Sequence, residues 1–141
     1  LKLSFMGTIT LNSLDLTRIQ TCLKEAMQVN AISKMEAATL IKEIQSASVV
    51  DPESIPSNVV TMNSIVQISF LNTKKTVEFQ IVYPNQANVK ENKISIFSPI
   101  ATALIGYKAG DEIDWVVPAG ITKIRIDAIV YQPEAAGHYN V

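Results

Sequence analysis

The sequence predicts an α+β protein in which a helical hairpin precedes a mainly antiparallel sheet. Apolar residues recur at helical spacing in roughly the first third of the chain, and they alternate with polar residues in the remainder. Pro52 and Pro56 lie between the two patterns, and proline ends a helix and favours extended backbone in the residue before it. We therefore expect a hairpin at 9–48, a linker at 49–58 and a sheet domain at 59–141, with hairpin and sheet as separate structural units.

The hairpin is expected to consist of two antiparallel helices of roughly 14–16 residues, or about 21–24 Å each at 1.5 Å per residue. Asp15 is expected to cap the first helix, and Ser33 followed by Glu36 predicts a capping box at the second. Residues 28–32 then form the turn. The two apolar stripes are Leu16, Ile19, Leu23, Ala26 and Met27 on the first helix and Ala37, Leu40, Ile41, Ile44 and Ala47 on the second.

The second part of the chain alternates with a period of two, which is typical of strands. One short helix interrupts it: Ser98 is the expected N-cap, Pro99 the first helical residue and Gly106 the left-handed residue after the end. The strands are expected at 66–70, 77–81, 94–96, 113–117 and 124–130, with turns at 72–75 and 118–120. The last strand should turn Ile124, Ile126, Ala128 and Val130 to one face and Lys123, Arg125 and Asp127 to the other.

Composition narrows the classes of partner. A domain that binds nucleic acid usually carries a basic excess, whereas the formal net charge of these 141 residues is −1. We therefore expect protein partners and no direct sequence-specific binding to nucleic acid. A single cysteine allows no disulfide within the chain, and no apolar run approaches the roughly 20 residues of a membrane helix, so a cytoplasmic location is expected. The pattern leaves the nature of residues 1–7 unexplained.

Several residues are of types found in catalytic or metal sites, but a structural role explains them better. Asp111, Glu112 and Asp114 are close in sequence, and we expect a solvated strand edge there rather than a metal site. Cys22 lies between apolar helix residues and is expected to be a core thiol, because His138, the only histidine, lies at the other end of the chain. His138 is expected at the surface. We therefore predict no catalytic residues, no metal and no cofactor.

Long stretches of the chain resemble a known family. The segment 98–113, followed by Pro-Ala-Gly at 118–120, is similar to the signature of the C-terminal domain of the Gre transcript-cleavage factors. The segments 14–19, 58–64 and 131–137 resemble the branch of this family known as regulators of nucleoside diphosphate kinase. The resemblance covers nearly the whole chain from about residue 9.

The resemblance implies an FKBP-like fold for the C-terminal domain and a coiled coil for the hairpin. In this family the C-terminal domain docks on the rim of the secondary channel of bacterial RNA polymerase, and the coiled coil points into the channel. Ser98 and Pro99 match the family's rim contact, whereas Phe97 stands where the family has a carboxylate or an amide. We therefore expect RNA polymerase as the partner, with these three residues at the contact.

The hairpin tip departs from the cleavage factors. Gre factors carry paired carboxylates there, which help to hold a second Mg²⁺ in the polymerase active centre. Mg²⁺ prefers hard oxygen ligands, and paired metal ions activate water for hydrolysis. The predicted tip from Met27 to Met35 contains no Asp or Glu, and the capping box already employs Glu36. The arm also looks too short, so we expect no transcript cleavage.

Four residues are candidates for a contact at the tip: Val29, Asn30, Ile32 and Met35. Three of them are apolar where a solvated turn would be polar. They either cap the small core of the hairpin or form a contact surface for a partner. A monomer is expected, and the sequence leaves dimerisation through the hairpin open.

Three functions remain in competition. The first is a regulator that docks at the secondary channel of RNA polymerase, competes with Gre factors and cleaves nothing. The second is a direct modulator of nucleoside diphosphate kinase or of nucleotide pools, as the name of the family branch suggests. The third is a prolyl isomerase, which the FKBP-like fold invites but the scattered aromatic residues, 6% of the chain, disfavour.

Overall fold

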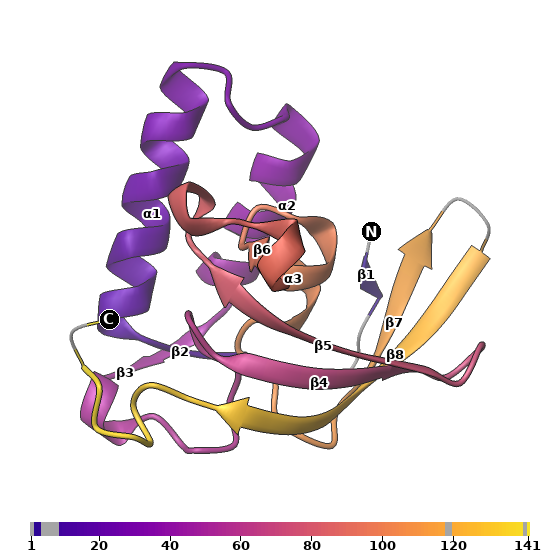
Figure 1. Cartoon of the computed structure of the whole chain (residues 1–141). Helices are drawn as coiled ribbons and strands as arrows, with labels where there is room; N and C mark the ends of the chain where they lie inside the picture. The colour runs from indigo at the N-terminus through magenta and orange to yellow at the C-terminus, as the bar shows by residue number, and fades with distance from the viewer. Residues whose placement is uncertain (1, 4–8, 118–119, 140) are drawn as a thin grey trace.

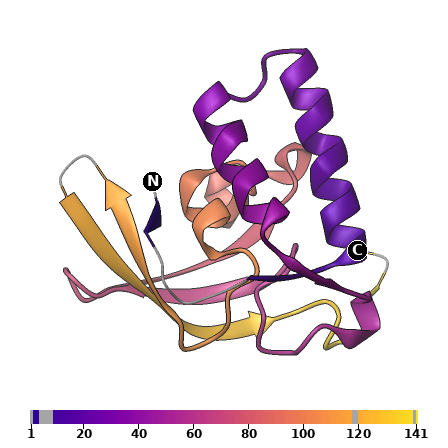
Figure 2. The same ribbon diagram turned by 180° about the vertical axis from the view of Figure 1, so that it is seen from behind.

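The computed structural model describes residues 2–3, 9–117, 120–139 and 141. In this part of the chain, six strands form a mixed sheet in the order β1-β7-β8-β4-β5-β6, and two more strands form a separate pair. A hairpin of two helices stands over one face of the sheet, with the short helix α3 close to its base (Figure 1). The view from behind shows the same two layers (Figure 2). The predicted α+β class is confirmed.

The elements follow the predicted order, with the hairpin first and the sheet second. The helices are α1 (Ser13–Gln28), α2 (Lys34–Gln45) and α3 (Pro99–Leu104), and short 3-10 helices lie at Pro52–Ser54, Pro84–Gln86 and Val89–Glu91. The strands are β1 (Lys2–Leu3), β2 (Thr10–Asn12), β3 (Ser48–Val50), β4 (Ile65–Phe70), β5 (Lys75–Val82), β6 (Lys93–Ser95), β7 (Glu112–Val117) and β8 (Gly120–Tyr131).

The sheet contains all five predicted strands and is mainly antiparallel, as predicted. The exception is β6, which runs parallel to β5. Strand β8 is also irregular opposite β4, where the pairing skips Asp127 and Val130. Each bulge reverses the alternation of side chains between the two faces. Ile129 therefore packs against the core and Val130 is 57% exposed, so the predicted face of this strand is wrong beyond Ile126.

Helix α1 begins earlier than the sequence pattern suggested. Its N-cap is Asn12, whose Oδ1 accepts the backbone N–H of Asp15 (2.8 Å), so the predicted cap at Asp15 is wrong. The predicted capping box at α2 is confirmed, because Ser33 Oγ accepts the N–H of Glu36 (3.0 Å) and Glu36 Oε1 accepts the N–H of Ser33 (3.5 Å). The helices have 16 and 12 residues, so α2 is shorter than expected.

The segment 49–58, expected as a linker, is structured in part. Strand β3 pairs in parallel with β2, and Ile55 is buried. The hairpin residues Ile19 and Leu40 belong to the same hydrophobic core as the buried residues of the sheet. The hairpin thus packs against the sheet rather than hanging from a free linker. The division of the chain into a hairpin at 9–48, a linker at 49–58 and a sheet domain at 59–141 stays a prediction.

Gly106 lies where the hairpin base meets the sheet layer. It follows α3 with a φ of +83°, as expected for the residue after a helix end. Its carbonyl accepts the N–H of Thr10 (3.1 Å), and its N–H donates to the carbonyl of Val60 (2.9 Å). A Cβ at this position would lie 2.7 Å from Cβ of Ile9, so no larger residue fits without a shift of the backbone.

We expect Gly106→Ala to lower the free energy of unfolding by about 2–4 kcal/mol, because it adds a steric clash to an unfavourable φ. Gly110→Ala is the matched control: its φ is +94°, but a Cβ there would meet nothing within 4 Å. It should cost only about 1 kcal/mol. Urea unfolding of both variants measures the difference, and equal losses would contradict the close approach of Ile9.

Candidate functional site

The predicted N-cap at Ser98 opens helix α3 in the structure. Ser98 Oγ accepts the N–H of Ala101 (3.4 Å), and Pro99 occupies the first helical position. Thr102 Oγ1 donates to the carbonyl of Ile96 (2.8 Å), which ties the helix to the segment before it. Ser98 is half-buried and Pro99 is exposed. The start of α3 therefore combines a fixed backbone with an exposed apolar ring.

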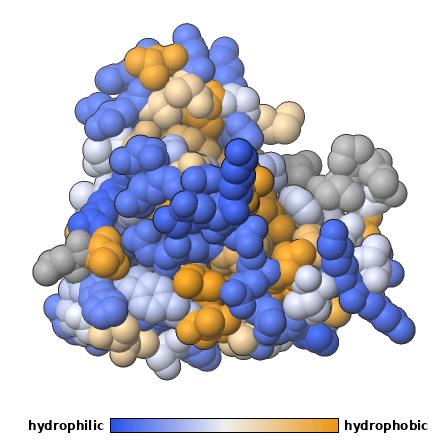
Figure 3. All heavy atoms as spheres, in the orientation of Figure 1, coloured by the Kyte–Doolittle hydropathy of each residue, from blue (hydrophilic) through white to orange (hydrophobic). Residues whose placement is uncertain are grey.

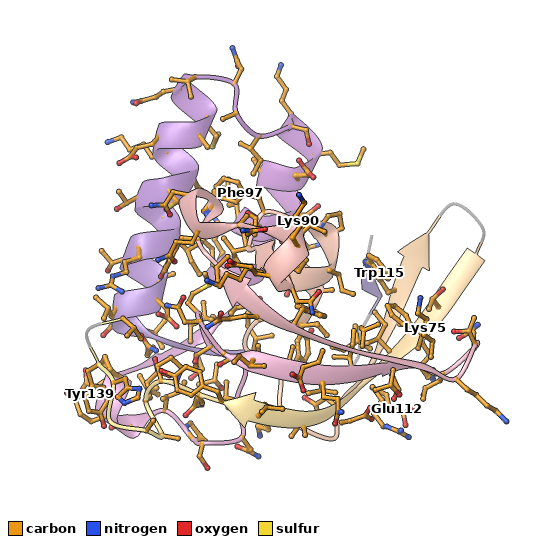
Figure 4. The ribbon with its side chains drawn as sticks, in the orientation of Figure 1. Lys75, Lys90, Phe97, Glu112, Trp115 and Tyr139 are labelled. Carbon is orange, nitrogen blue, oxygen red and sulfur yellow. The ribbon has the colours of Figure 1, made fainter. Side chains whose placement is uncertain are left out.

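Phe97 turns inward toward the hairpin. It packs against the hydrophobic core and is half-buried. Its ring lines two hollows, one shared with α1 and one shared with α2. Figure 4 shows Phe97 between the hairpin and the sheet layer. A carboxylate at this position would lose part of its hydration, which costs free energy. Phenylalanine avoids this cost and therefore stabilises the packing of the hairpin on the sheet layer.

The smaller hollow lies between α2 and α3, and we call it the α2–α3 cleft. Its volume is about 90 Å³. It is lined by Met35, Glu36, Thr39 and Glu43 of α2, by Phe97, Pro99, Thr102 and Ala103 at α3, and by Trp115 of β7. Trp115 is half-buried. Three segments far apart in the sequence thus meet in one cleft.

The larger hollow is a groove of about 830 Å³ between α1 and the residues that follow β5. Arg18 lies along it and donates from Nη1 to the carbonyl oxygen of Val141 (2.6 Å). The half-buried Cys22 also lines it, and burial raises the pKa of its thiol. This shift disfavours the thiolate form that a nucleophilic cysteine needs. Tyr83 also lines the groove, and its hydroxyl is buried.

The four candidate residues of the tip are separated. Ile32 is partly buried and packs against the core, whereas Val29 and Met35 are 72% and 77% exposed. Asn30 forms the turn with a left-handed φ of 56°. Hydrophilic side chains cover most of the hairpin in Figure 3, and a hydrophobic patch lies at its tip. Of the apolar tip residues Val29, Ile32 and Met35, only Ile32 caps the hairpin core. Val29 and Met35 are exposed and accessible to a partner.

The structure therefore brings Met35 beside Phe97 and Pro99 in the cleft. Val29 does not line the cleft; it lies on the larger groove, which Phe97 also lines. The sequence pattern places the tip and the start of α3 at different sites. No local pattern links these positions, because their proximity depends on how α2 packs on α3.

Asp111 and Asp114, which are close in sequence, have separate partners. Asp114 pairs with Lys123 (3.5 Å), and Asp111 accepts the N–H of Lys108 (2.9 Å). Among the described residues, no group of three or more His, Cys, Asp or Glu could hold a metal ion. His138 is exposed and its Nδ1 hydrogen-bonds with the Tyr131 hydroxyl (2.8 Å). None of the helices described is long and apolar enough to cross a membrane.

A buried polar cluster fixes the base of the hairpin. Asn12 Nδ2 donates to Asp15 Oδ2 (3.2 Å) and to Glu134 Oε2 (3.1 Å). The Met62 N–H donates to Asp15 Oδ2 (3.0 Å), and Thr61 Oγ1 donates to Glu134 Oε1 (2.8 Å). The cluster joins α1, the turn before β4 and the segment after β8. Buried carboxylates need such donors to offset the loss of water.

Burial raises the pKa of Asp15 from 3.8 to about 7, although the Met62 N–H lowers it and the nearby Glu134 raises it further. Asp15 is 5% exposed. The Asp15 carboxyl group therefore gains and loses its proton near neutral pH, whereas an ordinary aspartate is ionised there.

Comparisons with known proteins give consistent results. The family model "Transcription elongation factor, GreA/GreB, C-term" matches residues 55–131. The regulator of nucleoside diphosphate kinase of Escherichia coli K12 is 35% identical over 133 residues, which are 94% of this chain and 96% of that protein. GreA of Clostridium acetobutylicum is 37% identical over 105 residues, 74% of this chain and 66% of that protein. A solved GreA/GreB factor of Nitrosomonas europaea is 38% identical and superimposes with a TM-score of 0.71, covering 88% of this chain and 100% of that one.

The Asp15 carboxyl predicts a specific pH dependence of stability. Between the unfolded pKa of 3.8 and the folded pKa of about 7, the folded state binds the extra proton, so stability falls as the pH rises. We expect the wild type to lose about 2–3 kcal/mol more than Asp15→Asn between pH 5 and pH 8. Urea unfolding at both pH values measures this. Asp51→Asn, which changes an exposed carboxylate, should keep the wild-type slope; the same slope for Asp15→Asn would contradict the assignment.

Proposed function

The chain belongs to the GreA/GreB family of transcription elongation factors, and from this premise we propose that it docks at the secondary channel of bacterial RNA polymerase without cleaving transcripts. The relatives are named as elongation factors or as a regulator, and none of these names describes catalysis by the factor itself. The proposal includes an FKBP-like description of the sheet layer and a coiled-coil description of the hairpin. It also implies a cytoplasmic location, where the polymerase works.

One observation carries the proposal: the exposed start of α3 lies beside a hairpin whose tip has no carboxylate. The tip residues 27–35 contain no Asp or Glu, and Glu36 is engaged with Ser33 through the capping box. Hard cations such as Mg²⁺ need oxygen ligands, which this tip does not present. The docking part of a cleavage factor is thus combined with an arm that lacks the carboxylates needed to bind Mg²⁺ for transcript cleavage.

The size and attachment of the arm support the same view. Helices of 16 and 12 residues span about 24 and 18 Å at 1.5 Å per residue. Part of this length is packed on the sheet layer through Phe97 and the shared core. An arm that is both short and held at its base occupies the entrance of a channel and does not extend to a distant active centre.

Such a protein would act by exclusion. Two factors that use the same site compete by mass action, so the weaker or scarcer one is displaced. A docked factor without tip carboxylates would block the access of cleavage factors and leave a backtracked transcript intact. Ser98, Pro99 and Phe97 remain the proposed contact with the rim of the channel.

The test uses stalled, backtracked elongation complexes. Purified protein should not shorten the transcript, and it should slow cleavage by added GreA as its concentration rises. Pro99→Glu should weaken this competition by about tenfold, because it places a charge in the exposed apolar contact. Lys75→Glu, at the far end of the sheet in Figure 4, should compete like the wild type. Transcript shortening by the protein alone, or unchanged GreA activity at saturating protein, would overturn the proposal.

A second function is favoured by the name of the Escherichia coli relative, a regulator of nucleoside diphosphate kinase. A direct effect would require contact between the two proteins. Pure protein added to pure kinase distinguishes the cases: an immediate change in the rate of phosphoryl transfer supports direct modulation. No change supports an indirect effect through transcription.

A further inference from the structure

We propose that the α2–α3 cleft receives one apolar side chain from a basic segment of RNA polymerase, with Met35 of the hairpin forming one wall. The inference rests on the proposed function and deepens it. The contact would then belong to both parts of the molecule, the hairpin and the sheet layer, rather than to the start of α3 alone.

Five of the nine residues that line the cleft are apolar, and the other four are two glutamates and two threonines. Met35 is 77% exposed although it is apolar, and the capping box of Ser33 and Glu36 holds it at the start of α2. Phe97 packs against the core behind it, and Trp115 approaches from β7. Figure 4 shows Phe97 and Trp115 on different elements around α3. An unbranched, flexible methionine beside rigid rings is suited to adapt to an inserted side chain.

The size of the cleft selects its occupant. A volume of about 90 Å³ is well below the roughly 300–1,000 Å³ of pockets that hold small-molecule ligands. A single aliphatic or aromatic side chain is the matching unit. In protein interfaces such an anchor, inserted into a small apolar pocket, carries much of the binding free energy.

The charge at the cleft indicates what surrounds this side chain. Its charged lining residues are Glu36 and Glu43, and both are acidic. Complementary charges across an interface steer the approach and fix the register of the partners. The polymerase segment should therefore carry Lys or Arg next to the inserted apolar residue.

Met35 and Val29 are the two most exposed large apolar residues of the tip, and only Met35 lines the cleft. Val29 is 72% exposed, nearly as much as Met35, but it lines the larger groove beside α1. If apolar character at the tip were all that mattered, both residues would contribute equally. If the cleft is the contact, only Met35 contributes.

The test measures the affinity of the full chain for purified bacterial RNA polymerase core enzyme. Met35→Glu should raise the Kd by at least about tenfold, because it places a carboxylate beside two acidic residues in an apolar contact. Met35→Leu should stay within about threefold of the wild type, since it keeps volume and apolarity. Val89→Glu is the matched control, because Val89 is 79% exposed and lies outside the cleft; it should bind like the wild type.

The outcomes separate this inference from the proposed function. No binding by the wild type would overturn the proposed function and the inference with it. Binding that is weakened by Pro99→Glu but not by Met35→Glu would overturn the inference alone. An equal loss for Val29→Glu and Met35→Glu would also overturn it, because the tip rather than the cleft would then be the contact. Urea unfolding and the fluorescence of Trp115, the single tryptophan, check that each variant is folded.

Discussion

The packing of the helical hairpin on the sheet layer is the constraint on which the rest of the molecule depends. The apolar faces of α1 and α2 are buried in the same core as the sheet, and Phe97 fills the space between them. A pair of short helices is only marginally stable by itself in water, so this shared core supplies most of its stability. The same packing decides which side chains of α2 meet those of α3.

The attachment of the hairpin buries a carboxyl group at its base, and this burial costs free energy. Asp15 is buried, and its raised pKa shows that the ionised form is disfavoured there. Hydrogen bonds from Asn12 and Met62 offset part of this cost. An apolar residue would avoid it but would not impose the same geometry, since hydrogen bonds are directional and apolar contacts are not. The cluster therefore favours one angle between the hairpin and the sheet.

Local features of the fold could be read from the sequence, and non-local ones could not. The capping box at Ser33, the cap at Ser98 and the left-handed Gly106 depend on neighbouring residues, and all three were predicted. The spacing of Asn12 and Asp15 could also have located the first cap. The parallel pairing of β2 with β3 and the bulges of β8 depend on partners distant in sequence. The meeting of Met35, Pro99 and Trp115 is likewise a product of tertiary packing, so the candidate site was predicted only in pieces.

In the proposed complex, a face shared by α2 and α3 docks on RNA polymerase while the rest of the sheet stays free. Hydrogen exchange of the backbone, measured with and without purified polymerase, tests it most directly. We predict slower exchange in the polymerase complex for residues 33–39 and 97–103, and unchanged exchange in the turn 71–74 between β4 and β5. Unchanged exchange in both segments of the shared face, under conditions where the complex is formed, would contradict it.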